Sequence, residues 1–126
     1  MYCDHTEIEQ VFLNVIRNAG QAMAGGSTPR PHRITLRTRC EGKFARVELE
    51  DNGPGMDEKT RRRVFEPFFT TKPAGVGTGL GLSVSYFIIT EQHGGQMEVS
   101  SLPGKGTCFS IRLPLGKQSR GLGQKR

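Results

Sequence analysis

Apolar residues recur along the first part of the chain with the period of an α-helix. From Ile8 onwards they follow an i, i+3, i+4, i+7 spacing, which gathers them on one helix face. Asp4, with Glu7 three residues later, is typical of a capping box, and the glycines at 25–26 end the pattern. The sequence therefore predicts a helix over residues 6–23.

Two later stretches alternate apolar with polar residues, which is the period of a strand with one buried face. Residues 34–50 alternate around a turn at 41–43, and residues 97–113 alternate around a turn at 102–106. Each stretch is predicted to form an antiparallel hairpin, and Pro114 closes the second one.

The sequence between the hairpins predicts a short helix over 58–64 and a longer helix from Leu80 to His93, where Gly94 ends it. Residues 66–77 contain two prolines, two glycines and two threonines and are predicted to form a mobile loop. The order of the elements predicts an α+β fold. It is a two-layer α/β sandwich with three main helices on one face of a mostly antiparallel mixed sheet.

Length and charge then limit the kind of protein. With 126 residues, of which 34% are hydrophobic, the chain is expected to hold one domain over residues 1–115 and a basic flexible tail over 116–126. The net charge is +6, but four of the positive charges lie in the tail, which leaves about +2 elsewhere. No aromatic residues are interleaved with the basic ones, so nucleic-acid binding is not expected. The basic cluster at 59–63 is either a solvated helix face or an attraction for an anionic nucleotide or an acidic partner.

The three cysteines, Cys3, Cys40 and Cys108, are far apart and form no C-x-x-C pair, so neither a disulfide framework nor a zinc site is expected. This usage favours a reducing cytoplasm. No apolar run approaches the roughly 18 residues of a membrane span, so the chain is not expected to contact a membrane, although a parent protein could be anchored elsewhere.

Three amides lie together on one flank of the first predicted helix. At about 100° per residue, Asn14, Asn18 and Gln21 fall beside its apolar face. Their carbonyl oxygens suit Mg²⁺, which takes few protein ligands besides water and phosphate oxygens. The alternative is a polar flank that faces water.

Asp51 stands at the end of a predicted strand, next to Gly53 and Gly55. Asp-Asn-Gly is also a common turn sequence, so a purely local role is an alternative. In the longer D-x-G-x-G pattern, however, a buried carboxylate can accept a bond from the amine of adenine while the glycines let the ring approach. An aspartate in this position prefers adenine to guanine.

The glycine-rich stretch 75–81 contains overlapping G-x-G spacings, so a dinucleotide-binding loop has to be considered. Such a loop directly follows a strand of a parallel βαβ unit, whereas hairpins surround this one. The Walker spacing G-x-x-x-x-G-K-[ST] is absent as well. A helix that begins at residues 79–82 nevertheless offers N–H groups and a positive dipole end to phosphates.

Four segments in this order, Q-V-F-L-N-V-I-R-N-A, D-N-G-P-G-M, F-E-P-F-F-T-T-K and G-T-G-L-G-L-S-V, resemble the N, G1, F and G2 boxes of sensor histidine kinases. The wording F-F-T-T-K is most similar to the nitrogen-sensor and oxygen-sensor subgroup. The resemblance covers residues 4–115, and the family's strand before the first helix is truncated here. It implies the catalytic and ATP-binding domain of such a kinase, a Bergerat-type sandwich of the GHKL superfamily.

The resemblance implies ATP and Mg²⁺ as cofactors. It makes Asn18 the Mg²⁺ ligand, Asp51 the partner of the adenine amine, and Asn14 and Lys72 the catalytic residues. At Gln21 and Ala22 the chain departs from the lysine and aromatic residue of many members. The implied nucleotide-binding residues are Asn14, Asn18, Gln21, Asp51, Gly53, Gly55, Met56, Phe65, Thr71, Lys72, Gly77, Thr78, Gly79, Leu80, Gly81 and Leu82.

The implied function is transfer of the γ-phosphate of Mg-ATP to a histidine on a separate dimerisation and phosphotransfer domain, and indirectly to a response regulator. Related ATPases carry a glutamate base where this chain has Asn14, so the isolated domain, expected to be a monomer, should hydrolyse ATP slowly at most. His5, His32 and His93 do not resemble the family's phospho-acceptor. The alternative is a nucleotide-sensing module of the anti-sigma type, against which the wording F-E-P-F-F-T-T-K argues.

Overall fold

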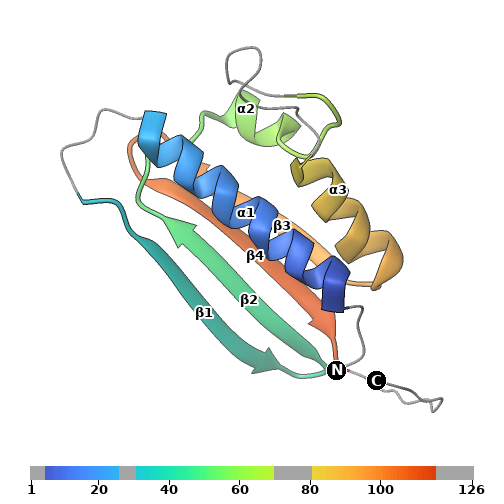
Figure 1. Cartoon of the computed structure of the whole chain (residues 1–126). Coiled ribbons are helices and arrows are strands. Elements are labelled where there is room, and N and C mark those ends of the chain that lie inside the picture. Colours follow the sequence, from blue (N-terminus) through green and yellow to red (C-terminus); the bar gives the residue numbers. More distant parts are fainter. Residues whose placement is uncertain (1–4, 26–30, 70–80, 116–126) are drawn as a thin grey trace.

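A computed structural model describes residues 5–25, 31–69 and 81–115. They form two layers, with a four-stranded sheet on one side and the helices packed on one of its faces (Figure 1). The element bounds in chain order are α1 (His5–Gly25), β1 (Ile34–Glu41), β2 (Phe44–Asp51), α2 (Glu58–Arg63), α3 (Gly81–Phe87), a π-helical turn η1 (Ile88–Gln92), β3 (Gln96–Leu102) and β4 (Gly106–Pro114). The predicted fold class and order of elements are confirmed.

The sheet has the strand order β1-β2-β4-β3, and each neighbouring pair is antiparallel. Both predicted hairpins are therefore present, and β2 pairs with β4 between them. The register of β2 with β4 sets Asp51 opposite Thr107 and Leu49 opposite Phe109. Opposite residues share a face of the sheet, so the last residue pair of this register places Thr107 beside Asp51, the residue predicted to bind adenine.

The core lies between α1 and the centre of the sheet. The helix face predicted from the 3.6 period is the buried one, with Val11 and Val15 almost inaccessible to solvent. Burial of each large apolar side chain stabilises the fold by about 1.5–3 kcal/mol relative to its exposure. The buried core cluster consists of Val11, Val15, Leu49, Ile88, Ile89, Met97, Phe109, Ile111 and Leu113.

The helix predicted from Leu80 to His93 is α-helical only as far as Phe87 among the described residues. Its last turn, η1, has π geometry, and the ring Nδ1 of His93 donates a hydrogen bond to the carbonyl of Ile88, five residues back, at 2.9 Å. Gly94 then adopts a φ of +64°, as the prediction of a glycine helix end requires. The prediction of one regular helix is wrong at this turn, because the π turn gives the end of the helix a wider period.

The other predicted elements agree with the structure within their described parts. The short helix predicted over 58–64 is α2, and its N-cap residue Asp57 accepts a bond from the backbone N–H of Thr60 at 2.8 Å. The cap residue Asp4, most of the loop 66–77 and the tail 116–126 lie outside the described residues. The helices of the described segments are too short or too polar to cross a bilayer.

Candidate nucleotide site

Asp51 ends β2 as a buried carboxylate, with 5% of its surface exposed. Its Oδ1 accepts a hydrogen bond from the backbone N–H of Gly53 at 2.8 Å, and the backbone of Thr107 binds the same carboxylate. Burial raises the pKa of Asp51 above its ordinary value, and the two backbone bonds oppose that rise. The bond from Gly53 is the local turn contact that was the alternative to a ligand-binding role for Asp51. A carboxylate has about four acceptor positions, however, and the two backbone bonds do not fill them. The site therefore retains capacity for a ligand donor.

The two glycines beside Asp51 have different roles. A Cβ built on Gly53 would lie 3.0 Å from Asp51 Oδ1 and 3.0 Å from Met23 Cγ, so a side chain at this position would crowd both the carboxylate and Met23. Gly55 has a φ of +74°, and its Cβ would lie 2.0 Å from the carbonyl oxygen of Leu102. The structure thus requires Gly55 for the approach of the loop to the β3–β4 turn, and its contact with a base stays a prediction.

A serine holds the loop after Asp51 in place. Ser101 Oγ accepts a bond from the backbone N–H of Met56 at 2.7 Å and donates one to the carbonyl of Gly106 at 2.9 Å. It also lies 2.8 Å from Thr107 Oγ1. These bonds join the loop after Asp51 to β3 and β4.

Asn14 faces the beginning of α3. Its Nδ2 donates to the carbonyl of Gly81 and to Ser85 Oγ, both at 3.0 Å, and its Oδ1 accepts from Gln10 Nε2 at 2.9 Å. Asn18 and Gln21 are half-buried farther along α1. The amide flank predicted from the sequence therefore turns, at Asn14, toward a neighbouring helix.

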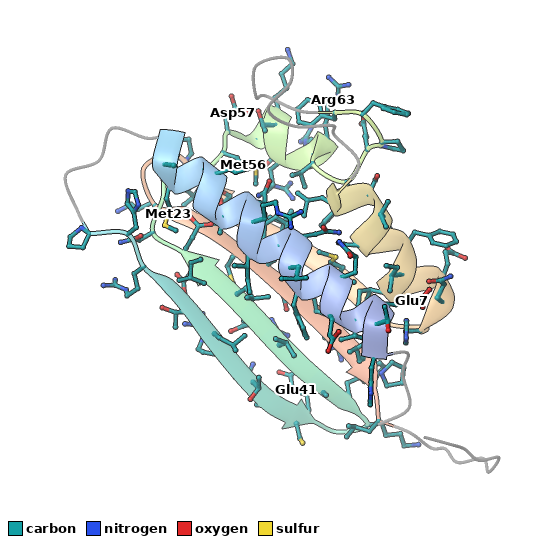
Figure 2. The ribbon with its side chains drawn as sticks, viewed as in Figure 1. Glu7, Met23, Glu41, Met56, Asp57 and Arg63 are labelled. Carbon is teal, nitrogen blue, oxygen red and sulfur yellow. The ribbon has the colours of Figure 1, made fainter. Side chains whose placement is uncertain are left out.

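Three of the predicted site residues, Asn14, Asn18 and Gln21, lie in sequence along α1. Met23 and Met56 lie near the C-terminal end of this helix and Glu7 near the opposite end (Figure 2). Asn14 precedes Met23 by nine residues, or about 14 Å of helix at 1.5 Å per residue. Asn18 and Asn14 are therefore displaced along α1 from the end at which Met23 lies.

The aromatic residue Phe65 has a packing role. Its ring centroid lies 4.8 Å from that of Tyr86 and 6.1 Å from that of Phe109, and it packs against the core cluster, as does Leu82. Gly81 begins α3, where its carbonyl receives the Asn14 bond. The remaining predicted residues, Thr71, Lys72, Gly77, Thr78, Gly79 and Leu80, lie outside the described residues.

The basic cluster on α2 is largely paired. Glu58 forms ion pairs with Arg61 at 2.6 Å and with Arg62 at 2.9 Å, and Arg63 pairs with Glu66 at 3.1 Å. The two arginines lower the pKa of Glu58 to about 2. The structure favours the solvated helix face over a nucleotide-attracting one.

Three polar residues at this site were missed in the sequence. Thr107 and Ser101 meet the Asp51 loop only through the register of the second hairpin, and Ser85 meets Asn14 only through helix packing. Thr107 could have been found from the sequence, because antiparallel pairing of the second strands of the two predicted hairpins, with their ends matched, places it opposite Asp51. No local pattern marks Ser85.

Comparison with known proteins adds to this geometry. Residues 3–117 match the family described as "Histidine kinase-, DNA gyrase B-, and HSP90-like ATPase". Sporulation kinase E of Bacillus subtilis (strain 168) is 42% identical over 115 residues, which are 91% of this chain and 15% of that kinase. The sensory histidine kinase/phosphatase NtrB of Klebsiella oxytoca is 40% identical over 124 residues, covering 90% of this chain and 33% of NtrB. The chain thus spans a third or less of the length of these relatives.

Solved structures show the same similarity. The catalytic domain of histidine kinase ThkA, in a nucleotide-free form, matches with a TM-score of 0.75 at 33% identity, over 90% of this chain and 70% of that one. A mycobacterial sensor histidine kinase, MprB, matches with a TM-score of 0.72 at 30% identity, over 88% of this chain and 72% of that one.

Proposed function

Because the chain belongs to the family of histidine kinase-, DNA gyrase B- and HSP90-like ATPases and corresponds to the catalytic ATPase domain of sensor histidine kinases, we propose that it binds Mg-ATP and transfers the γ-phosphate to a histidine. In this reaction a nitrogen of the imidazole bonds to the γ-phosphorus, and the bond to the bridging oxygen of ADP breaks. The acceptor histidine belongs to a separate dimerisation and phosphotransfer domain, from which a response regulator takes the phosphate.

The observation that carries the proposal is the buried carboxylate of Asp51. It lies at the end of a strand, beside Gly53, where any larger residue would crowd the carboxylate. A carboxylate at such a place accepts a hydrogen bond from the exocyclic amine of adenine, whereas guanine presents a carbonyl oxygen at the corresponding position. Thr107, buried next to Asp51, adds a polar group beside the carboxylate.

The donor set of the site fits Mg²⁺ bound with a nucleotide. Within the described residues no group of three or more His, Cys, Asp or Glu could hold a metal ion. Mg²⁺ that accompanies a nucleotide needs no such cage, since it takes few protein ligands and completes its shell with phosphate oxygens and water. Asn18 supplies the amide oxygen in this proposal, while Lys72 and Thr78 neutralise and hold the triphosphate. The ion supplies charge neutralisation at the phosphates.

Asn14 occupies the position of the base that the related ATPases use. An amide cannot accept a proton as a carboxylate does, so water is not activated and hydrolysis is slow. Catalysis of the transfer then rests on orientation and on charge neutralisation. We further propose that the domain comprises residues 1–115, is monomeric in isolation and works in the cytoplasm.

Titration calorimetry with ATP and Mg²⁺ tests the first half of the proposal. We expect binding by the wild-type chain and at least a tenfold weaker affinity in Asp51→Ala, because a buried hydrogen bond to the base is lost. Equal affinities in the two proteins, or no binding by the wild type, would refute it.

Radiolabelled ATP tests the second half. We expect slow phosphate release by the chain alone and labelling of a dimeric histidine-bearing domain from a related kinase only when both are mixed. A control acceptor with its histidine changed to alanine should remain unlabelled. Brisk hydrolysis without acceptor would contradict the assignment of Asn14.

A further inference from the structure

Ser85 is a fully buried polar residue in the middle of α3, with an exposed fraction of 0%. Its hydroxyl donates a hydrogen bond to the carbonyl of Gly81, four residues earlier, at 2.9 Å. Its oxygen also accepts a bond from Asn14 Nδ2 of α1 at 3.0 Å. A buried hydroxyl with both of these bonds is satisfied, and it joins two helices that are far apart in sequence.

The hydrogen bonds around Asn14 determine which way its amide points. The carbonyl of Gly81 can only accept, so it requires the NH₂ group of Asn14 on the α3 side. The hydroxyl proton of Ser85 is directed at the same carbonyl, which leaves its lone pair for the second Nδ2 proton. Oδ1 is therefore left as the acceptor of the amide, and it receives the bond from Gln10 Nε2 of α1 at 2.9 Å.

We propose that Ser85 is a positioning residue, which holds the amide of Asn14 with its NH₂ group bound to α3 and its oxygen kept as the acceptor. This inference rests on the proposed function, in which Asn14 lies at the phosphate end of the site. A carbonyl oxygen held there accepts a hydrogen bond from a proton donor at the reacting phosphate, while a freely rotating amide would also present NH₂. Ser85 thus acts on the transfer step through Asn14 and leaves the base-binding end unchanged.

The chain contains a matched control in the following turn. Thr90 Oγ1 donates to the carbonyl of Tyr86, also four residues earlier, at 2.7 Å, and this bond stays within its own helix. Thr90→Val removes a helix back-bond of the same kind as Ser85→Ala does. Ser85→Ala also removes an acceptor of Asn14, and because Ser85 is fully buried whereas Thr90 is partly exposed, the melting temperatures of the two variants are compared as well.

The test measures transfer from ATP to a histidine-bearing domain at saturating acceptor, together with the melting temperature. In Ser85→Ala we expect kcat to fall about tenfold and the KM for ATP to change less than about twofold, since misplacement of a group near the reacting atoms affects the rate more than ground-state binding. Thr90→Val should transfer at the wild-type rate. The double variant Asn14→Ala with Ser85→Ala should be no slower than Asn14→Ala alone, because Ser85 acts only through Asn14.

The side-chain amide of Asn14 offers a readout that needs no activity. In ¹⁵N NMR spectra its two Nδ2 protons should be well dispersed and slow to exchange in the wild type and in Thr90→Val, and should become faster to exchange in Ser85→Ala. Equal exchange and equal kcat in Ser85→Ala and Thr90→Val would overturn the inference. If the wild type neither binds ATP nor transfers phosphate, the proposed function fails, and the exchange measurement still decides whether Ser85 holds Asn14.

Discussion

At Asp51, folding places an ionisable group where ionisation is disfavoured. Burial raises its pKa above the ordinary 3.8, although the backbone N–H of Gly53 partly compensates. In the folded state the carboxyl therefore keeps its proton to a higher pH than in the unfolded chain. The free energy of unfolding must then fall as pH rises from about 3.8 through the raised pKa. The buried Asp51 carboxylate thus lowers the stability of the fold at neutral pH, and such a cost is typical of a residue that serves a binding site.

Asp51→Asn tests this cost directly. The amide oxygen can still accept the Gly53 bond, but no charge has to be buried, so we expect the variant to gain stability relative to the wild type between pH 4 and pH 7. ATP affinity should fall about 10- to 100-fold, because NH₂ would then face the amine of adenine. Urea unfolding at several pH values and titration calorimetry measure the two effects.

Asp57 offers a control of opposite sign. The backbone N–H and the hydroxyl of Thr60 lower the pKa of Asp57 below its ordinary value of 3.8. The ionised carboxylate therefore adds to the free energy of unfolding above pH 3.8, and this contribution is lost as the pH falls below that value. Asp57→Asn should therefore lose stability at pH 7, lose little at low pH, and keep its ATP affinity. A pH dependence of the same sign in both variants would contradict the burial of Asp51.

Whether a residue of the candidate site could be predicted depends on how far its contact partner lies along the chain. The turn contact between Asp51 and Gly53 could be predicted, because the two residues are neighbours in the sequence, while their role toward a ligand stays a prediction. Thr107 was missed because it meets Asp51 only through a cross-strand register. Gly55 was predicted for a ligand, but its need for glycine comes from Leu102, a contact across 47 positions that no local pattern contains.

At the scale of elements, the first helix could be predicted to within two residues at each end and the last only in part. A single apolar stripe packs α1 on the sheet, and its period is visible in the sequence. In α3 the face toward α1 carries the polar Ser85, while Val84 and Phe87 are exposed. The π turn then carries Ile88 and Ile89, which are both buried in the core.

Two glycines in different elements should respond oppositely to alanine. Gly20 is exposed within α1, and a Cβ there meets nothing within 4 Å, so Gly20→Ala should stabilise the fold by about 0.5–1 kcal/mol through a lower backbone entropy cost. Gly55→Ala should destabilise it by about 2 kcal/mol or more, because of the positive φ and the clash with Leu102. Urea unfolding measures both, and a neutral Gly55→Ala would show that the loop can move away from the β3–β4 turn.

At the scale of the whole molecule, the helices cover the sheet unevenly. α1 lies over its centre, while β1 lies at an edge beyond the helical layer (Figure 1). Leu36 of β1 and Leu49 of β2 are directly opposite and share the helix-facing side, yet their exposed fractions are 60% and 4%. Arg37, whose guanidinium pairs with Glu48 and Glu50, adds charge to the other side of the edge strand.

Substitutions of Leu36 and Leu49 test where the hydrophobic core ends. Leu36→Thr should change the free energy of unfolding by less than about 1 kcal/mol, because little apolar area is lost and threonine suits a strand. Leu49→Thr should cost about 2–5 kcal/mol, since it opens the core and buries a hydroxyl beside Phe109. Leu36→Thr should also associate less at high concentration in sedimentation velocity, because an exposed apolar edge favours strand pairing between molecules. Equal losses of stability at the two positions would mean that β1 is covered in solution, and the outer boundary of the core would then lie beyond β1 rather than at β2.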